Sequence, residues 1–63
     1  MKNKALAALI GKIGVTDSDL NPEGTVLIDN EIYDVKTDGE LVEEGRGVRV
    51  IRVRGAKIWV KRV

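Results

Sequence analysis

The stretch Val48-Arg49-Val50-Ile51-Arg52-Val53-Arg54 decides the fold, because its alternation of apolar and basic residues changes phase in the middle. Val48 and Val50 occupy one phase of an extended strand, whereas Ile51 and Val53 occupy the other. A β-bulge shifts the phase by one residue and bends the strand strongly. The stretch therefore predicts a strand with a sharp bend between Val50 and Ile51.

Four other segments have strand-like patterns, at residues 12–16, 25–28, 32–37 and 57–61. Asp29-Asn30 and Gly55-Ala56 are suited to the tight turns between neighbouring strands. No segment supplies the long helix of a parallel crossover, so the sheet should be mainly antiparallel. Five short strands can bury one face and remove their exposed edges by curling into a closed barrel. We predict an all-β fold, a small five-stranded antiparallel barrel of OB-like or SH3-like form.

A short apolar segment precedes the first strand. Asn3 is suited to cap a helix over residues 4–10, which Gly11 would end. The narrow apolar stripe of this helix consists of Leu6, Leu9 and Ile10. Two turns of helix are marginal alone, so the segment should dock on the barrel or represent the remnant of an upstream lead-in. The expected organisation is a lead-in over residues 1–10 and one barrel domain over residues 11–63.

Length and composition restrict the chemistry. A chain of 63 residues makes one domain, and a domain of this size buries only about 60% of the surface that its unfolded form exposes. It contains neither cysteine nor histidine, which excludes disulfides and Cys-based zinc sites and removes the usual general base. A hydrophobic content of 43% beside a charged content of 33% is typical of a globular chain. The longest apolar run, residues 5–10, is far too short to cross a bilayer, so we expect this chain itself to be soluble.

The segment from Gly11 to Gly24 has a lysine between glycines, two carboxylates and the only proline. A P-loop needs Ser or Thr after its Gly-Lys pair, but Ile13 stands there. An RNA-binding GxxG loop sits between two helices, which the strand pattern here does not provide. An EF-hand loop that began at Asp17 would need glycine and glutamate where the sequence has Pro22 and Ile28. We therefore expect a strand and a wide turn whose Asp and Ser side chains bond local backbone amides.

Catalytic groups are scarce in this sequence. Ser18 is the only serine, and no histidine is available to activate it. A Ser-Lys dyad would need a buried lysine, whereas Lys12 should lie on a solvent face. The paired carboxylates are expected to be solvated loop residues, namely Asp17 with Asp19 and Glu43 with Glu44. The sequence thus predicts a protein that is not an enzyme, with no catalytic, cofactor or metal site.

The charge distribution is lopsided. Residues 1–45 carry four lysines and all ten acids, a net charge of −6, whereas residues 46–63 carry +7 with no acid. Such asymmetry is typical of a surface that faces a polyanion, and it is equally expected if the two parts face each other across a sheet. The candidate binding residues should lie on the outside of the last two strands; they are Arg52, Arg54, Lys57, Trp59 and Lys61.

Three kinds of surface fit these cations. A solvated face would pair them with acids such as Asp34 or Glu31, at about 0–1 kcal/mol for each exposed pair. A nucleic-acid site needs several stacking aromatics, and Tyr33 is the only residue available to join Trp59. An acidic lipid surface fits only if a parent protein holds the domain at a membrane. Trp59 is either covered by the N-terminal helix or exposed among the lysines as a hot spot for a protein partner.

Short motifs run through almost the whole chain. The first are Gly11-Lys12-Ile13-Gly14 and Leu20-Asn21-Pro22-Glu23-Gly24-Thr25-Val26. The next are Ile28-Asp29, Tyr33-Asp34, Gly39-Glu40, Gly45, Val48-Arg49-Val50, Val53, Gly55, Ile58 and Val60. In order and spacing these motifs resemble the C-terminal soluble domain of the NfeD family, over about residues 9–63. Two positions depart from the family's pattern: Asn30, where its turn usually has glycine, and Val35, where it often has alanine.

The resemblance implies a five-stranded OB-fold barrel that is attached, in a parent protein, to transmembrane helices. Members of this family are typically encoded beside stomatin- or prohibitin-like membrane proteins and are thought to work with them. Longer members carry an N-terminal serine protease domain of the ClpP type, to which nothing in this sequence corresponds. The chain is then expected to be either a fragment that follows a membrane segment or a stand-alone relative, membrane-associated through its parent and cytoplasmic.

The residues and the resemblance together predict a non-enzymatic interaction module that binds or scaffolds a stomatin- or prohibitin-like partner, or copies of itself. The alternative is a weak single-stranded nucleic-acid-binding OB-fold, which the basic segment favours and the scarcity of aromatics opposes. Salt dependence separates the two, because counterion release makes polyanion binding weaken steeply as salt rises.

Overall fold

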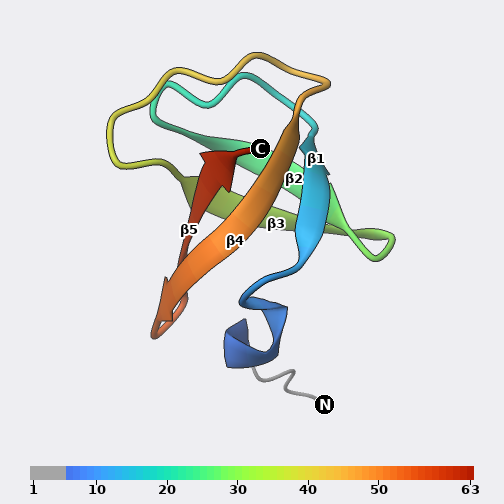
Figure 1. Ribbon diagram of the computed structural model, residues 1–63, viewed down its shortest axis with the longest axis vertical. Coiled ribbons are helices and arrows are strands. Elements are labelled where there is room, and N and C mark those ends of the chain that lie inside the picture. The colour runs from blue at the N-terminus through green and yellow to red at the C-terminus, as the bar shows by residue number, and fades with distance from the viewer. Residues whose placement is uncertain (1–5) are drawn as a thin grey trace.

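The computed structural model describes residues 6–63 and has a closed barrel of five strands in the order β1-β2-β3-β5-β4 (Figure 1). A short 3-10 helix, η1 (Leu6–Leu9), precedes the strands, which are β1 (Ile13–Thr16), β2 (Glu23–Ile28), β3 (Glu31–Lys36), β4 (Gly47–Arg54) and β5 (Lys57–Arg62). All neighbouring strands are antiparallel except β3 and β5, which run parallel and meet at Lys36 and Trp59. The prediction of an all-β OB-fold barrel is confirmed, with this one parallel pair closing a mainly antiparallel sheet.

The predicted bulge lies in the middle of β4. Val50 is paired with Val60 of β5, and Arg52 is paired with Trp59, so Ile51 is the extra residue. Ile51 points out of the barrel and is 41% exposed, while Val53 returns to the half-buried inner side. The bend lets β4 pair with β1 over its first half and with β5 over its whole length.

The two tight turns lie where the sequence predicts them. Asp29 and Asn30 join β2 to β3 with φ values of 51° and 68°, as a two-residue hairpin turn requires. Gly55 starts the turn between β4 and β5 with a φ of 61°. Because these positions need left-handed backbone, Asp, Asn and Gly serve there at little steric cost.

Strand β1 turns its aliphatic side chains outward. Ile13 and Val15 share one face, as their alternation predicts, but they are 50% and 48% exposed. Gly14 and Thr16 occupy the inner face instead. A Cβ on Gly14 would lie 2.6 Å from both the Leu27 carbonyl oxygen and a side-chain carbon of the next inner residue on β2, so only glycine fits between these strands.

Loops and η1 close the two ends of the barrel. The turn η1 lies at the lower end of the barrel in Figure 1, and its Leu9 is 4% exposed and belongs to the core. At the other end Leu20 and Val42 form an isolated bridge between two loops, and both side chains are inaccessible to solvent. The remaining core residues come from the strands and are Val26, Ile28, Val35, Val48, Val50, Ile58 and Val60.

The described part of the lead-in, from Leu6 onward, is a single 3-10 turn rather than the predicted α-helix. Its 3-10 geometry places residues three apart above one another, so Leu6 and Leu9 both pack on the core. Ile10, the third residue of the predicted stripe, is 52% exposed. Gly11 ends the turn with a φ of 91°, as expected. The predicted cap, Asn3, lies outside the described residues.

Candidate functional site

The five predicted binding residues lie together on the outer face of the β4–β5 hairpin. Arg52 stands opposite Trp59, and Arg54 stands opposite Lys57 at the turn. Lys61 faces a residue that the prediction omitted, Arg49. Antiparallel partners point their side chains to the same side, so these three pairs form one surface. We call it the basic face; it comprises Arg49, Arg52, Arg54, Lys57, Trp59 and Lys61.

The ring of Trp59 is held between cations. The guanidinium carbon of Arg52 lies 4.3 Å from the ring centroid, and Nζ of Lys36, on β3, lies 5.7 Å from it. Both distances fall within the range of cation–π attraction. The half-buried ring is therefore covered by side chains of neighbouring strands. The described turn η1 packs against β4 and the core instead, so it is not the cover that the sequence suggested.

Within the described residues, most cations of the basic face form no ion pair with an acid. Arg52 pairs with Asp38 at 3.3 Å between Nη2 and Oδ1, with both side chains more than half exposed. Lys36, beside the ring, pairs with Glu23 at 3.7 Å. Within residues 6–63, no ion pair is formed by Arg49, Arg54, Lys57 or Lys61. The acids of these two ion pairs are thus Asp38 and Glu23, which the sequence did not single out as partners for the cations.

Two pairs of like charges flank the central Arg52–Trp59 pair. Arg49 lies directly opposite Lys61, and Arg54 lies directly opposite Lys57. Like charges in directly opposed positions destabilise a sheet. The arrangement costs the isolated domain stability, and an anionic group bound at this face would remove that cost.

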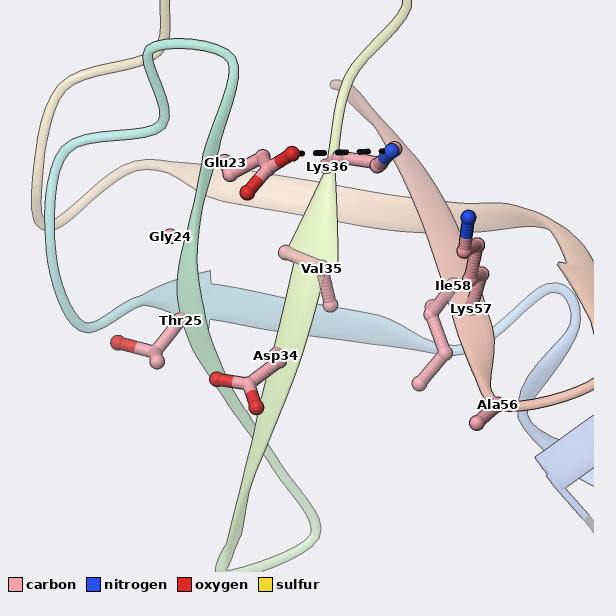
Figure 2. Close-up of a pocket in the computed structure, with 9 residues that line it drawn as sticks. All are labelled: Glu23, Gly24, Thr25, Asp34, Val35, Lys36, Ala56, Lys57 and Ile58. Carbon is pink, nitrogen blue, oxygen red and sulfur yellow. Dashed lines mark ion pairs between the residues drawn. The ribbon is translucent and has the colours of Figure 1, made fainter.

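A groove opens beside the basic face, where β5 diverges from β3 (Figure 2). It has a volume of about 500 Å³, and Val35 and Ile58 stand on its two sides. The Glu23–Lys36 ion pair crosses one end. The other lining residues are Gly24, Thr25, Asp34, Ala56 and Lys57. Sequence reasoning missed this groove, because the single paired position between β3 and β5, Lys36 with Trp59, has no local signal in the chain.

The polar side chains of the loop between β1 and β2 form hydrogen bonds that hold the barrel's loops together. The hydroxyl of Ser18 accepts a hydrogen bond from the Thr25 amide at 3.0 Å, as predicted for a local turn. Asp19 reaches further and accepts a hydrogen bond from the Glu44 amide at 2.8 Å, which ties two loops together. Nζ of Lys12 is 2.7 Å from a carboxylate oxygen of Asp29 instead. Within residues 6–63, the hydrogen bonds of the Ser18 hydroxyl are to Thr25 and to the Asp19 carbonyl.

A second surface was also missed, on the outer side of β1, β2 and β3. Val15 is paired with Leu27, and Leu27 with Ile32, so their exposed side chains form a row across three strands. Ile13 adjoins this row on β1. Alternation predicts a shared face for Ile13 and Val15, but it does not say which face is buried.

Metal and membrane signals are not found in the described part of the chain. Residues 6–63 contain no group of three or more potential ligands placed to hold a metal ion. In the same range, no helix has the length and apolar character needed to span a bilayer.

Known proteins share both the sequence and the shape of this chain. A family model described as "NfeD-like C-terminal, partner-binding domain" matches residues 6–62. The membrane protein NfeD1b of Bacillus subtilis (strain 168) is 40% identical over 63 residues. That match covers 100% of this chain but only 14% of the relative.

Two solved structures have the same fold. The C-terminal domain of stomatin operon partner protein 1510-C from Pyrococcus horikoshii matches with a TM-score of 0.88 and 29% identity, over 97% of each chain. The soluble domain of a membrane protein implicated in regulation of membrane protease activity, from Corynebacterium glutamicum, gives a TM-score of 0.84 at 24% identity. This second match covers 92% of the present chain and 97% of the other.

Proposed function

This chain belongs to the NfeD family, as one of its C-terminal, partner-binding domains, and we propose that it binds or scaffolds a stomatin- or prohibitin-like membrane protein without catalysing a reaction. The name of the Pyrococcus horikoshii relative, a stomatin operon partner protein, supports this choice of partner. The domain would be held at the membrane by other parts of a parent protein and would face the cytoplasm.

The basic face is the observation that carries the proposal. Trp and Arg are enriched at the centres of protein interfaces, and here Arg52 stacks on Trp59 in the middle of the face. The two opposed pairs of like charges around this centre gain a favourable partner only when an acidic segment binds. We therefore assign partner binding to Arg52, Arg54, Lys57, Trp59 and Lys61, together with Arg49.

To test this, the isotope-labelled domain is titrated with the soluble domain of a stomatin-like protein, and binding is measured by calorimetry and amide NMR. Replacing Trp59 by Ala should weaken binding by about thirtyfold, the effect of losing a hot-spot residue worth about 2 kcal/mol. The matched control is Lys12→Gln, because Lys12 lies outside the basic face and is already paired with Asp29. Equal binding by both variants would refute the assignment of this face.

Single-stranded nucleic acid remains the second candidate, because four cations that form no ion pair within residues 6–63 share the basic face with an aromatic ring. Each stacked base contributes about 1–3 kcal/mol, and Trp59 is the one platform on this face. Tyr33 packs against the core, and its hydroxyl donates to Glu31 at 2.7 Å. A mixed-sequence oligonucleotide should therefore bind weakly. Saturable binding that falls steeply with salt would favour this candidate over a protein partner.

A further inference from the structure

Strand β3 has one paired edge and one edge that is mostly unpaired. It pairs with β2 from Glu31 to Lys36, over six residues. On its other side it meets β5 only where Lys36 is paired with Trp59. Below that contact the two strands diverge and leave the groove between them (Figure 2). The barrel is therefore closed at one end of β3 and open along the rest of this edge.

The register of β2 and β3 fixes where the backbone groups of β3 point. The Thr37 amide donates to the Pro22 carbonyl at 2.9 Å, at the pair that continues the ladder. Hydrogen-bonded and non-hydrogen-bonded pairs alternate along an antiparallel ladder. Val35 thus bonds to β2, whereas Asp34 directs its N–H and C=O groups into the groove. Ile32 directs its own toward the same edge of β3, beyond the residues that line the groove. Within residues 6–63, no backbone hydrogen bond from β5 or a loop meets those groups.

Unpaired strand edges are the usual sites at which an extended segment of another protein adds to a sheet. We infer that the β3 edge accepts an extended, acidic segment of a protein partner, which lies in the groove as an additional strand beside Ile32 and Asp34. This inference deepens the proposed function and rests on it in one respect, that the occupant is a protein. The binding surface is the β3 edge and not the basic face.

The chemistry around the groove defines the segment. Val35 and Ile58 offer an apolar floor for side chains on one face of the added strand. Lys57 lines the rim, forms no ion pair within residues 6–63 and continues directly into the basic face through Arg54, whereas the lining acid Glu23 is already paired with Lys36. Carboxylates on the other face of the added strand would meet these cations. The segment should therefore alternate apolar and acidic residues, with the period of two that an extended chain has.

The first test uses amide hydrogen exchange in the isolated domain, because exchange reports which N–H groups are bonded. The amides of Ile32 and Asp34 should exchange at least about a hundredfold faster than that of Val35. The probe is then a short peptide of alternating glutamate and valine, and the matched control peptide has lysine in place of glutamate. The glutamate peptide should slow the Ile32 and Asp34 amides by at least about tenfold, and the lysine peptide should not.

A backbone substitution gives the second test. Asp34→Pro removes an N–H that points into the groove, and proline is tolerated on a strand edge that faces solvent. It should weaken binding of the glutamate peptide by at least about tenfold. Asp34→Ala keeps the N–H, removes a carboxylate from an acid-binding groove, and should bind at least as well as the unchanged domain. Exchange in the unchanged protein decides the question if Asp34→Pro does not fold.

The outcomes separate this inference from the proposed function. If the stomatin-like domain binds but leaves the Ile32 and Asp34 amides unprotected, the strand-addition site is wrong and the proposed partner stands. If the peptide protects these amides while the stomatin-like domain does not bind, the site stands and the proposed partner is wrong. If the peptide perturbs only the surroundings of Trp59, without slowing exchange in β3, the inference is overturned.

Discussion

Arg52 and Trp59 are cross-strand partners at the first paired position after the bulge, and the guanidinium carbon lies 4.3 Å from the ring centroid. The extra residue, Ile51, is what brings Arg52 into register with the ring. The same local feature thus bends the barrel and builds the centre of the basic face. Folding and the proposed partner binding share this position, so a substitution there should change both stability and binding.

The stacked pair should contribute measurably to stability. Arg52→Ala removes a cation–π contact at an exposed site, so the free energy of unfolding should fall by about 0.5–1 kcal/mol. The exposed ion pair with Asp38 adds little to this. Urea denaturation followed by tryptophan fluorescence measures the change. Arg49→Ala is the control: it removes an arginine that opposes Lys61, and it should leave stability unchanged or slightly raised.

Reversing the charge of one residue in a like-charge pair should raise stability and weaken partner binding. In Lys57→Glu the new carboxylate faces Arg54, so the free energy of unfolding should rise by about 0.2–1 kcal/mol. The gain should shrink at high salt, where charges are screened. Binding of the stomatin-like domain should weaken in the same variant. A variant that is both more stable and equally competent to bind would show that the basic face is an ordinary solvated surface.

Gly14 should tolerate no side chain. In Gly14→Ala the new methyl group meets the Leu27 carbonyl oxygen at 2.6 Å, so β1 and β2 must separate, at a cost of about 1–3 kcal/mol. Gly47→Ala is a matched control in a neighbouring strand, because its methyl group meets only a side-chain methyl of the exposed residue Val63, at 3.2 Å. Thermal unfolding of the two variants, monitored by circular dichroism, should show a clear loss for the first alone.

The loop residue Leu20 should behave as part of the core. Leu20→Ala opens a cavity at a side chain with no exposed surface, so it should cost about 2–5 kcal/mol and leave much of the population unfolded. Leu41, beside the bridge partner of Leu20, is 60% exposed. Leu41→Ala should therefore change stability by no more than about 0.5 kcal/mol. Similar losses in both variants would contradict the burial of this loop.

The barrel should need the extra residue of β4 but not the particular side chain that this residue carries. Ile51→Thr alters a side chain that is 41% exposed and should preserve the fold. Deleting Ile51 instead leaves a regular alternation in which Arg52 still opposes Trp59 on the outer face, but it removes the bend that lets β4 pair with both β1 and β5. The deletion should abolish cooperative unfolding. A folded deletion variant would mean that the bend in β4 arises elsewhere.

Much of the candidate site could be predicted because it depends on alternation within one hairpin. Lys57, Trp59 and Lys61 alternate with buried residues of β5, so their shared outer face follows from the period of two. Arg49 follows the same rule on β4 but was not included. Lys36 could not be added in this way, because its place beside Trp59 arises from a contact between β3 and β5 across the barrel.

The sequence by itself determined the strands, the turn at Asp29-Asn30 and the bulge at Ile51, because each is set by the conformational preferences and side-chain alternation of a few adjacent residues. Only the tertiary structure decided that Val15 faces outward. The close approach of β1 and β2 leaves no room for a side chain at position 14, so Gly14 takes the inner side. Closure of the barrel likewise decided where β3 and β5 meet. That long-range register sets the cover of Trp59 and the unpaired edge of β3, and no local pattern encodes it.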